Sequence, residues 1–192
     1  MIHLGHDIFI FKNILDNKLM EDLLNLRLDS KHTERIDIDI EDISIFSDFN
    51  SFWFDVIENK ILDEYLSIYD IDKNIGMNAS LDTIKFIKEY CKTRWRSVFL
   101  LQYDNVNSID CDKRVHFDFS GISAIGCIND NYIGGELVFP RHNIIYKLSK
   151  GDLIVFPGGI THPHYVNQTT KGIRDVIVAQ SLVFRTDNQI II

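Results

Sequence analysis

Residues 151–166 read GDLIVFPGGITHPHYV, and this stretch decides the fold of the second half of the chain. The apolar run Asp152–Phe156 is rich in β-branched residues and is followed by Pro157 and a glycine pair, which is typical of a buried strand. The run His164–Asn167 predicts a second short strand after the turn. The same alternation of short strands and glycine turns recurs through most of the sequence after residue 95.

The second half of the chain therefore predicts a sheet-rich core. The strands expected from the sequence are Ser97–Tyr103, Arg114–Asp118, Ser123–Ile128, Glu136–Phe139, Ile144–Leu148, Asp152–Phe156, His164–Asn167 and Ile173–Phe184. Gly134-Gly135, Lys150-Gly151 and Gly158-Gly159 predict turns between several of them. So many short strands within about 90 residues predict a jelly-roll barrel, in which two sheets enclose a small-molecule site.

The first half of the chain has mainly helical patterns. Asp16 is the expected N-cap of a helix with Leu19, Leu23, Leu24 and Leu26 on its apolar face. Residues 51–69 predict an amphipathic helix, and residues 81–92 predict another with Ile84, Ile87 and Cys91 facing inward. Ile8–Phe11 reads as a short strand. Residues 36–40 alternate between isoleucine and aspartate, which favours a strand with one solvated acidic face over a cation site.

These patterns predict a single domain of the α+β class, mainly β, over residues 1–192. Residues 1–94 form a mostly helical cover with a few strands, and residues 95–186 form a double-stranded β-helix (jelly-roll) catalytic core. The net charge of -8 argues against a nucleic-acid partner, since phosphate binding usually needs a basic surface. Three cysteines without a close pair, no signal peptide and no membrane-spanning run predict a cytoplasmic location.

His116-Phe117-Asp118 is the clearest chemical motif in the sequence. Side chains two residues apart on a strand point the same way, so the imidazole and the carboxylate can converge on one ion. Two neutral histidines and one carboxylate can hold Fe(II) on one face and leave positions open for substrate and oxygen. The third ligand would come from His162 or His164, which share strand parity, and the fixed cation of Arg174 could anchor a dicarboxylate beside the metal.

At this point the sequence over residues 95–186 resembles the prolyl-4-hydroxylase-like branch of the iron and 2-oxoglutarate dioxygenases. The resemblance rests on HFD at 116–118, FLLQY at 99–103, AIGCINDNY at 124–132, GGELVFP at 134–140, GDLIVFP at 151–157, HPHYV at 162–166 and GIR at 172–174. It implies that His116, Asp118 and His164 are the metal ligands. It also implies that Arg174 binds the distal carboxylate of 2-oxoglutarate, with help from the Tyr103 hydroxyl.

The family pattern places the arginine ten residues after the distal histidine, which selects His164 over His162. Pro163 favours the same choice, because proline is more natural at a strand entrance than inside a ladder. His162 would then line the pocket mouth or cap a turn. For His3, His6, His32 and His142 we expect surface positions. Lys171 is expected in a turn, and Glu136 is expected to have a structural use.

The resemblance implies catalytic His116, Asp118, His164 and Arg174, with Fe(II), 2-oxoglutarate and O2 as reactants and ascorbate as a further candidate cofactor. The expected reaction is hydroxylation of a C–H bond, with a prolyl residue of a peptide or protein as the leading substrate. A free amino acid or another small metabolite is the alternative within the same chemistry.

Two other classes remain open from the sequence. They are a cupin-like metal enzyme, in which Arg174 would have no role, and a non-catalytic module that binds metal and 2-oxoglutarate. Nucleic-acid demethylation is disfavoured, because Gln180 and Ser181 stand where demethylases carry a second arginine.

Overall fold

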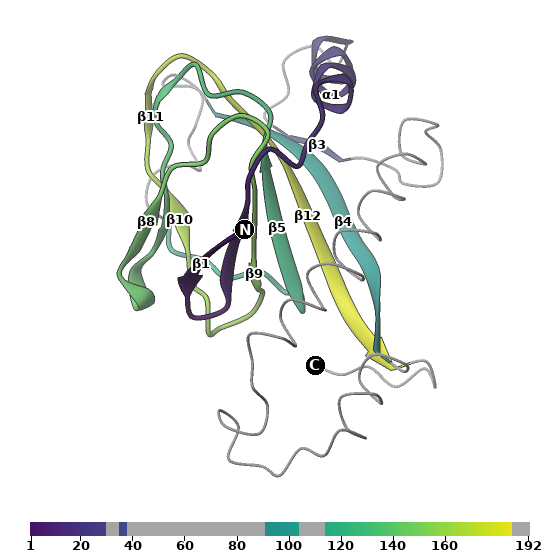
Figure 1. The fold of residues 1–192 in the computed structure, drawn as a ribbon, viewed down its shortest axis with the longest axis vertical. Coiled ribbons are helices and arrows are strands. Elements are labelled where there is room, and N and C mark those ends of the chain that lie inside the picture. Colours follow the sequence, from purple (N-terminus) through teal and green to yellow (C-terminus); the bar gives the residue numbers. More distant parts are fainter. Residues whose placement is uncertain (30–34, 38–90, 104–113, 186–192) are drawn as a thin grey trace. The chain divides into compact units, whose positions relative to one another are not determined.

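The computed structural model describes residues 1–29, 35–37, 91–103 and 114–185 (Figure 1). The chain divides into two compact units, residues 1–40 with 95–181 and residues 41–94 with 182–192. In the second unit only the outer ends of two long strands are described. The first unit contains the sheets, the core and all the candidate site residues.

The first unit is built around one large antiparallel sheet whose strand order is β1-β2-β9-β5-β12-β4-β3. Its strands are β1 Ile2–Gly5, β2 Ile8–Phe11, β3 Arg35–Asp37, β4 Cys91–Tyr103, β5 Ile122–Cys127, β9 Leu153–Pro157 and β12 Arg174–Arg185. Apart from the β1–β2 hairpin, most neighbours in this order are far apart in the chain, so crossovers connect them. β5 is central, with β9 on one side and β12 on the other.

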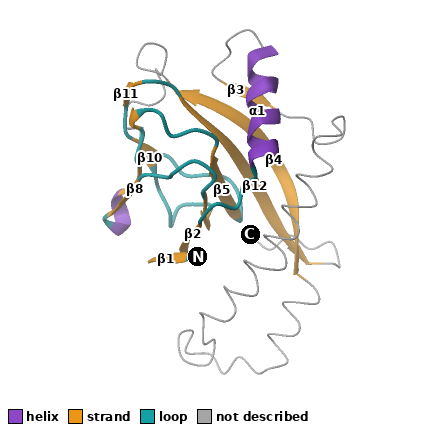
Figure 2. Cartoon of the chain, turned by 45° about the horizontal axis from the view of Figure 1, so that its top comes forward, coloured by secondary structure: helices purple, strands orange, loops and turns teal. Residues whose placement is uncertain are grey.

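Two smaller sheets lie beside the large one (Figures 1 and 2). One has the order β10-β7-β8, and the other pairs β11 with β6. Their strands are β6 Ile133–Gly134, β7 Leu137–Phe139, β8 Ile144–Tyr146, β10 Tyr165–Val166 and β11 Thr169–Lys171, and the short 3-10 helix η2 spans Pro140–His142. The fold is mainly β, with a large and a small sheet facing each other as in a jelly roll.

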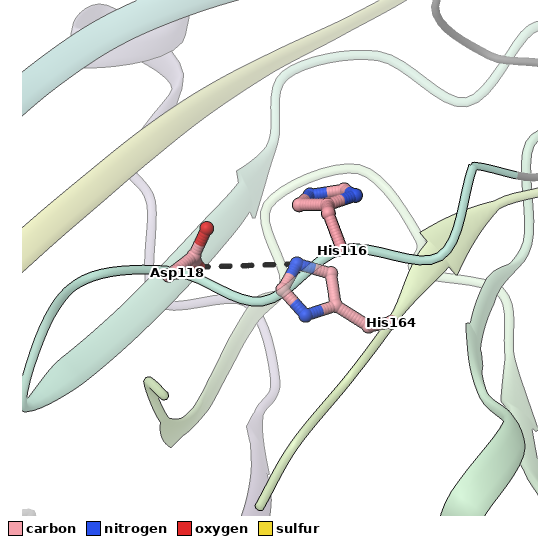
Figure 3. A group of neighbouring side chains, drawn as sticks. All are labelled: His116, Asp118 and His164. Carbon is pink, nitrogen blue, oxygen red and sulfur yellow. Dashed lines mark ion pairs between the residues drawn. The ribbon is translucent and has the colours of Figure 1, made fainter. Parts of the chain in front are cut away.

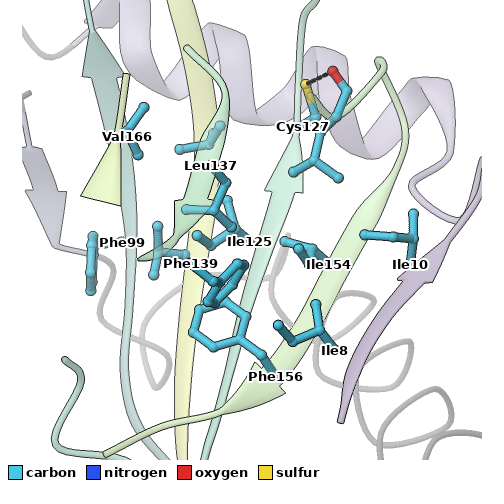
Figure 4. Close-up of a cluster of buried hydrophobic side chains, with 13 residues drawn as sticks. Ile8, Ile10, Phe99, Ile125, Cys127, Leu137, Phe139, Ile154, Phe156 and Val166 are labelled. Atoms are coloured by element: carbon cyan, nitrogen blue, oxygen red, sulfur yellow. Dashed lines mark hydrogen bonds between the residues drawn. The ribbon is translucent and has the colours of Figure 1, made fainter. Parts of the chain in front are cut away.

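The core lies between these sheets, and side-chain alternation along the strands explains it. Residues two apart on a strand share a face. The inner face therefore takes Ile125 and Cys127 from β5, Ile154 and Phe156 from β9, and Val176 and Val178 from β12. Leu137 and Phe139 of the small sheet pack against them, as Figure 4 shows. The rings of Phe139 and Phe156 meet edge to face with centroids 5.0 Å apart.

The other face of β5 is covered by the segment around α1 (Asn17–Asp29). A Cβ atom at Gly126 would lie 2.8 Å from both Leu15 Cδ1 and Ile177 Cγ2, so the glycine lets these side chains pack closely against β5. The backbone N–H of Leu19 donates to Asp16 Oδ1 over 2.7 Å, which confirms the predicted N-cap. Among the described residues, no helix has the length and apolar character needed to cross a membrane.

Most of the predicted strands are confirmed, with changed ends, but two predictions are wrong. β4 already begins at Cys91, so the helix predicted over residues 81–92 does not extend through Cys91 and Lys92. The predicted strand Arg114–Asp118 is reduced to a single bridge between His116 and His164. The sequence patterns do not predict the strands β1, β6 and β11. The predicted helix over residues 51–69, residues 81–90, residues 38–40 and His32 lie outside the described residues.

Asp152 ties the N-terminal segment to the start of β9. Its side chain is fully buried and accepts hydrogen bonds from the backbone N–H groups of Asn13 (3.2 Å) and Ser149 (3.0 Å). Asp152 also forms a hydrogen-bonded ion pair with Lys12. The hydrogen bond to Asp152 raises the pKa of the Lys12 ammonium. Removing the Asp152 carboxylate would leave buried donors without an acceptor. The resulting loss of stability exceeds the net contribution of each hydrogen bond.

We expect Asp152→Ala to lower the free energy of unfolding by about 3 kcal/mol, because two backbone donors and a cation lose their acceptor. Urea denaturation measures this difference. Asp37→Ala is the matched control, because the ion pair between Asp37 and Arg35 is exposed on β3 and should contribute little. Equal effects of the two substitutions would contradict the structural role of Asp152.

Candidate metal centre

His116 and His164 are brought together by two backbone hydrogen bonds. The His116 N–H donates to the His164 carbonyl over 3.0 Å, and the His164 N–H donates back over 2.8 Å. The pairing does not continue to the next hydrogen-bonded position, because the His162 N–H donates to the Gly159 carbonyl over 3.2 Å. Two residues after His116, the Asp118 carbonyl accepts from the Gly159 N–H over 2.7 Å. The segment before β5 is thus fixed against the segment before β10.

The side chains of His116, Asp118 and His164 converge from these two segments (Figure 3). One ligand atom from each lies within 4.8 Å of the others. His164 Nε2 is 3.8 Å from Asp118 Oδ2, and the two imidazole centroids are 4.5 Å apart. His164 is buried, Asp118 is partly buried and His116 is exposed. A metal held there would therefore be reached from the His116 side.

Hydrogen bonds to the backbone set the tautomer of both histidines. His116 Nδ1 lies 3.0 Å from the Arg114 carbonyl, and His164 Nδ1 lies 3.0 Å from the His162 carbonyl. A carbonyl only accepts, so each Nδ1 carries the proton and each Nε2 keeps its lone pair. This is the arrangement by which proteins orient metal-binding histidines. Burial also lowers the pKa of His164, which favours the neutral, ligating form.

Asp118 is oriented by a buried serine that the sequence motifs did not indicate. Ser123 on β5 donates to Asp118 Oδ2 over 2.5 Å, and its hydroxyl lies 2.7 Å from the Ser120 hydroxyl. Ser123 shares the inner face of β5 with Ile125 and Cys127, where an apolar residue would be usual. The sequence contains one indication of this role, namely a polar residue, Ser123, at an inward-facing position of a predicted strand.

His162 is buried but does not join the convergent group. Its Nε2 donates to the His6 carbonyl over 2.6 Å, and its Nδ1 lies 2.9 Å from Thr161 Oγ1. Burial lowers its pKa, so it stays neutral with one nitrogen donating and the other accepting. The His142 ring stacks on His6 and lies tilted against His162, with centroids 4.7 Å apart. The shared strand parity of His162 and His164 could not reveal this difference, which arises from the contacts with the N-terminal turn.

Arg174 begins β12 on the same inner face as Val176 and Val178, and it is only 1% exposed. Among the described residues, its Nε and Nη1 atoms have no hydrogen-bond partner. Its guanidinium carbon lies 4.9 Å from the centroid of the Tyr103 ring. The next residue, Asp175, faces the other way, and its carboxylate accepts from Gln102 (2.9 Å) and Asn129 (2.8 Å). A buried cation without an acidic partner is a site for an anion.

The remaining candidates have other surroundings. Glu136 accepts a hydrogen bond from the side chain of Asn167 over 3.0 Å, in keeping with a structural use. Lys171 ends β11 in an exposed position, just before Gly172 with a φ of 79°. His3 and His6 are exposed, and His142 is partly buried. None of these residues belongs to the group of three potential metal ligands found among the described residues.

No protein-family model matches the chain, and a comparison with curated proteins finds no match. Solved structures do match. A viral collagen prolyl hydroxylase from Paramecium Bursaria Chlorella virus-1, solved as a 2OG complex, has a TM-score of 0.56 at 13% identity over 94% of this chain and 96% of its own. A 2OG-Fe(II) oxygenase family oxidoreductase from Burkholderia pseudomallei has a TM-score of 0.54 at 13% identity over 91% and 84%.

A solved structure with a different kind of bound molecule also matches. NgTET1 in complex with 5mC DNA has a TM-score of 0.51 at 15% identity, over 91% of this chain and 71% of its own. At such identities the likeness shows a shared fold. The activity and substrate of this chain must therefore be inferred from its own site residues and not from the shared fold.

We expect His164→Ala to weaken binding of a divalent metal by at least about a hundredfold, more than the loss of an outer-shell partner costs. Titration of the protein with Co(II), followed by visible absorption, measures this affinity. His162→Gln is the matched control, since glutamine can still donate to the His6 carbonyl and His162 is not a ligand. A comparable loss in His162→Gln would contradict the assignment.

Proposed function

We propose that this protein is an Fe(II)- and 2-oxoglutarate-dependent dioxygenase that hydroxylates a C–H bond. The observation that carries the proposal is the pairing, on one inner face of the barrel, of a His-Asp-His group with a buried arginine that has no acidic partner among the described residues. A metal site alone would fit many enzymes. A metal site together with a buried anion site fits an enzyme whose metal ion and cationic residue bind the same dicarboxylate cosubstrate.

The donor set fits Fe(II). His116 and His164 offer neutral nitrogens and Asp118 offers one carboxylate, which is the 2-His-1-carboxylate set of non-haem iron oxygenases. These three donors would leave the remaining coordination positions of such a metal open. A cupin-like metal enzyme would share the donor atoms, but it would leave the buried guanidinium of Arg174 without a function.

The anion site fits the distal carboxylate of 2-oxoglutarate. On β5, Ser123 contacts Asp118 and Cys127 lies near Arg174, and the two residues share the inner face. On β12, Arg174 lies two residues beyond Val176, which pairs with Cys127. A dicarboxylate that contacts the metal at one end and Arg174 at the other would therefore lie along this inner face.

Fe(II) and 2-oxoglutarate, when bound, supply the oxidation of an unactivated C–H bond with O2 and the release of succinate. The residues of this chain hold and orient these reactants. His116, Asp118 and His164 hold the metal on one face, Arg174 fixes the dicarboxylate, and Tyr103 presents its ring to the guanidinium. Phe139 and Phe156 pack against the His164 ring and exclude water from the buried side of the site.

For the substrate we propose a prolyl residue in a peptide or protein. Phe117 and Phe119 flank Asp118, are 37% and 70% exposed, and stack edge to face with centroids 5.1 Å apart. Exposed aromatic pairs favour proline-rich segments, which bind in an extended and ordered conformation. The viral structure with the same fold is a collagen prolyl hydroxylase. A free amino acid would use the same chemistry without needing this aromatic surface.

We expect the protein, loaded with Fe(II) and 2-oxoglutarate without oxygen, to show a weak visible charge-transfer band that His116→Ala abolishes. Arg174→Ala should weaken 2-oxoglutarate binding by about ten- to a hundredfold, since a hydrogen bond to a charged group is lost. Lys171→Ala, which removes an exposed cation three residues away, should leave the titration unchanged. Wild-type protein that binds iron but never forms the band would exclude the proposed function.

Succinate release across a panel of proline-containing peptides, free amino acids and methylated oligonucleotides tests the substrate class. We expect stimulation by the peptides. Phe119→Ala should raise KM for a peptide severalfold by removing aromatic contact area, with little change in 2-oxoglutarate affinity. Stimulation by a free amino acid that Phe119→Ala does not affect would favour the small-molecule alternative.

A further inference from the structure

Tyr132 is a buried tyrosine that packs beside Arg174 at Gly135. It lies between β5 and β6, and it is 5% exposed. Its hydroxyl is 3.6 Å from the Cys127 sulfur and close enough to Arg174 for a hydrogen bond between the two side chains to influence its titration. Tyr132 ends the segment AIGCINDNY at 124–132, which contributes to the resemblance without giving Tyr132 a role. Its position comes from the fold of the segment between the two strands.

The backbone packing holds Tyr132 rigidly against Arg174. A Cβ atom at Gly135 would lie 2.7 Å from Arg174 Cδ and 2.8 Å from Tyr132 Cε2, so a glycine is required where these two side chains meet. The φ of 71° at Gly135 also favours glycine. Lys147 donates to the Tyr132 carbonyl over 2.9 Å, and its ammonium lies 4.7 Å from the Tyr132 ring centroid. These contacts position the Tyr132 ring beside the Arg174 side chain.

The two tyrosines beside Arg174 present different groups to it. Tyr103 presents its ring face, since the guanidinium carbon is 4.9 Å from the ring centroid. This geometry stabilises the cation through the ring electrons. Tyr132 presents its hydroxyl. A carboxylate held by the guanidinium needs additional donors in the same place, and a phenolic O–H can donate where a ring face cannot.

The Tyr132 hydroxyl and the Cys127 thiol near Arg174 are both neutral. Burial raises the pKa of the Tyr132 hydroxyl and of the Cys127 thiol above their usual ranges. Neither can therefore neutralise the guanidinium, and the Tyr132 proton is available for donation throughout the physiological pH range. Arg174 Nε and Nη1 have no partner among the described residues. The site combines a cation with a neutral donor, which is complementary to one carboxylate.

We propose that Tyr132 is a binding residue for 2-oxoglutarate and donates its phenolic O–H to the carboxylate that Arg174 holds. This inference rests on the proposed function and assigns the hydroxyl contact to Tyr132, whereas Tyr103 contributes its ring face. The Cys127 thiol can donate to the Tyr132 oxygen over 3.6 Å, and in that arrangement the phenolic proton is available for the ligand.

The test compares Tyr132→Phe with Tyr103→Phe by calorimetric titration of 2-oxoglutarate into protein loaded with Zn(II), which cannot turn over. Tyr132→Phe should weaken binding about tenfold, the loss of one hydrogen bond to a charged group. Tyr103→Phe keeps the ring face and should stay within about twofold of the wild type. Loss in Tyr103→Phe with none in Tyr132→Phe would overturn the assignment.

A second ligand separates binding from packing. The ligand 2-oxopentanoate has the length of 2-oxoglutarate but a methyl group in place of the distal carboxylate. It should bind the wild type and Tyr132→Phe equally. Equal weakening of both ligands would show a merely structural role for Tyr132. If Tyr132→Phe does not fold, the tyrosine ultraviolet difference spectrum that 2-oxoglutarate binding produces gives the test. Tyr103→Phe should retain this difference spectrum in full. Loss of the spectrum in Tyr103→Phe would refute the proposal.

Failure of this inference is distinct from failure of the proposed function. If the wild type binds 2-oxoglutarate and Arg174→Ala weakens it while Tyr132→Phe does not, the dioxygenase proposal stands and only the role of Tyr132 falls. If the wild type binds no 2-oxoglutarate, or Arg174→Ala has no effect, the proposed function itself falls.

Discussion

The candidate site depends on two backbone hydrogen bonds, those that His116 and His164 exchange. These residues are 48 positions apart in the sequence, and the pairing does not continue as a regular ladder, because the His162 N–H donates to the Gly159 carbonyl. One bridge is nevertheless sufficient to set the register. A slip of one residue would turn the His164 side chain to the opposite face and remove it from Asp118. The contact from the Gly159 N–H to the Asp118 carbonyl opposes such a slip.

The inner face of β5 then relates the metal group to the anion site. Ser123, Ile125 and Cys127 point the same way, and they orient Asp118, fill the middle of the core and border Arg174, respectively. Because β5 pairs with both β9 and β12, its position is fixed on both sides. The two ends of the site are therefore held at a constant separation by one short strand. A ligand that contacts both ends must match that separation, which selects for its length as well as its charge.

Local patterns were sufficient to predict most strands, because apolar runs and glycine turns follow directly from side-chain alternation. They were also sufficient to bring His116 and Asp118 to one side. They failed where tertiary contacts decide. Cys91 continues an apolar helical pattern but belongs to the long strand β4, where pairing within the sheet overrides local propensity. Ser123 and Tyr132 could not be assigned, since their partners Asp118 and Arg174 become neighbours only after the sheets close.

Arg174 shows most directly how the fold favours one kind of ligand. Burying an ion without a counter-ion costs several kcal/mol, and the adjacent Tyr103 ring offsets only part of this. The neighbouring Tyr132 and Cys127 are held neutral by burial, and Asp175 is directed to the other face of β12. Every nearby group that the structure describes therefore leaves the positive charge uncompensated. A carboxylate that enters this position removes the cost of the buried charge, so part of its binding free energy is already built into the folded chain.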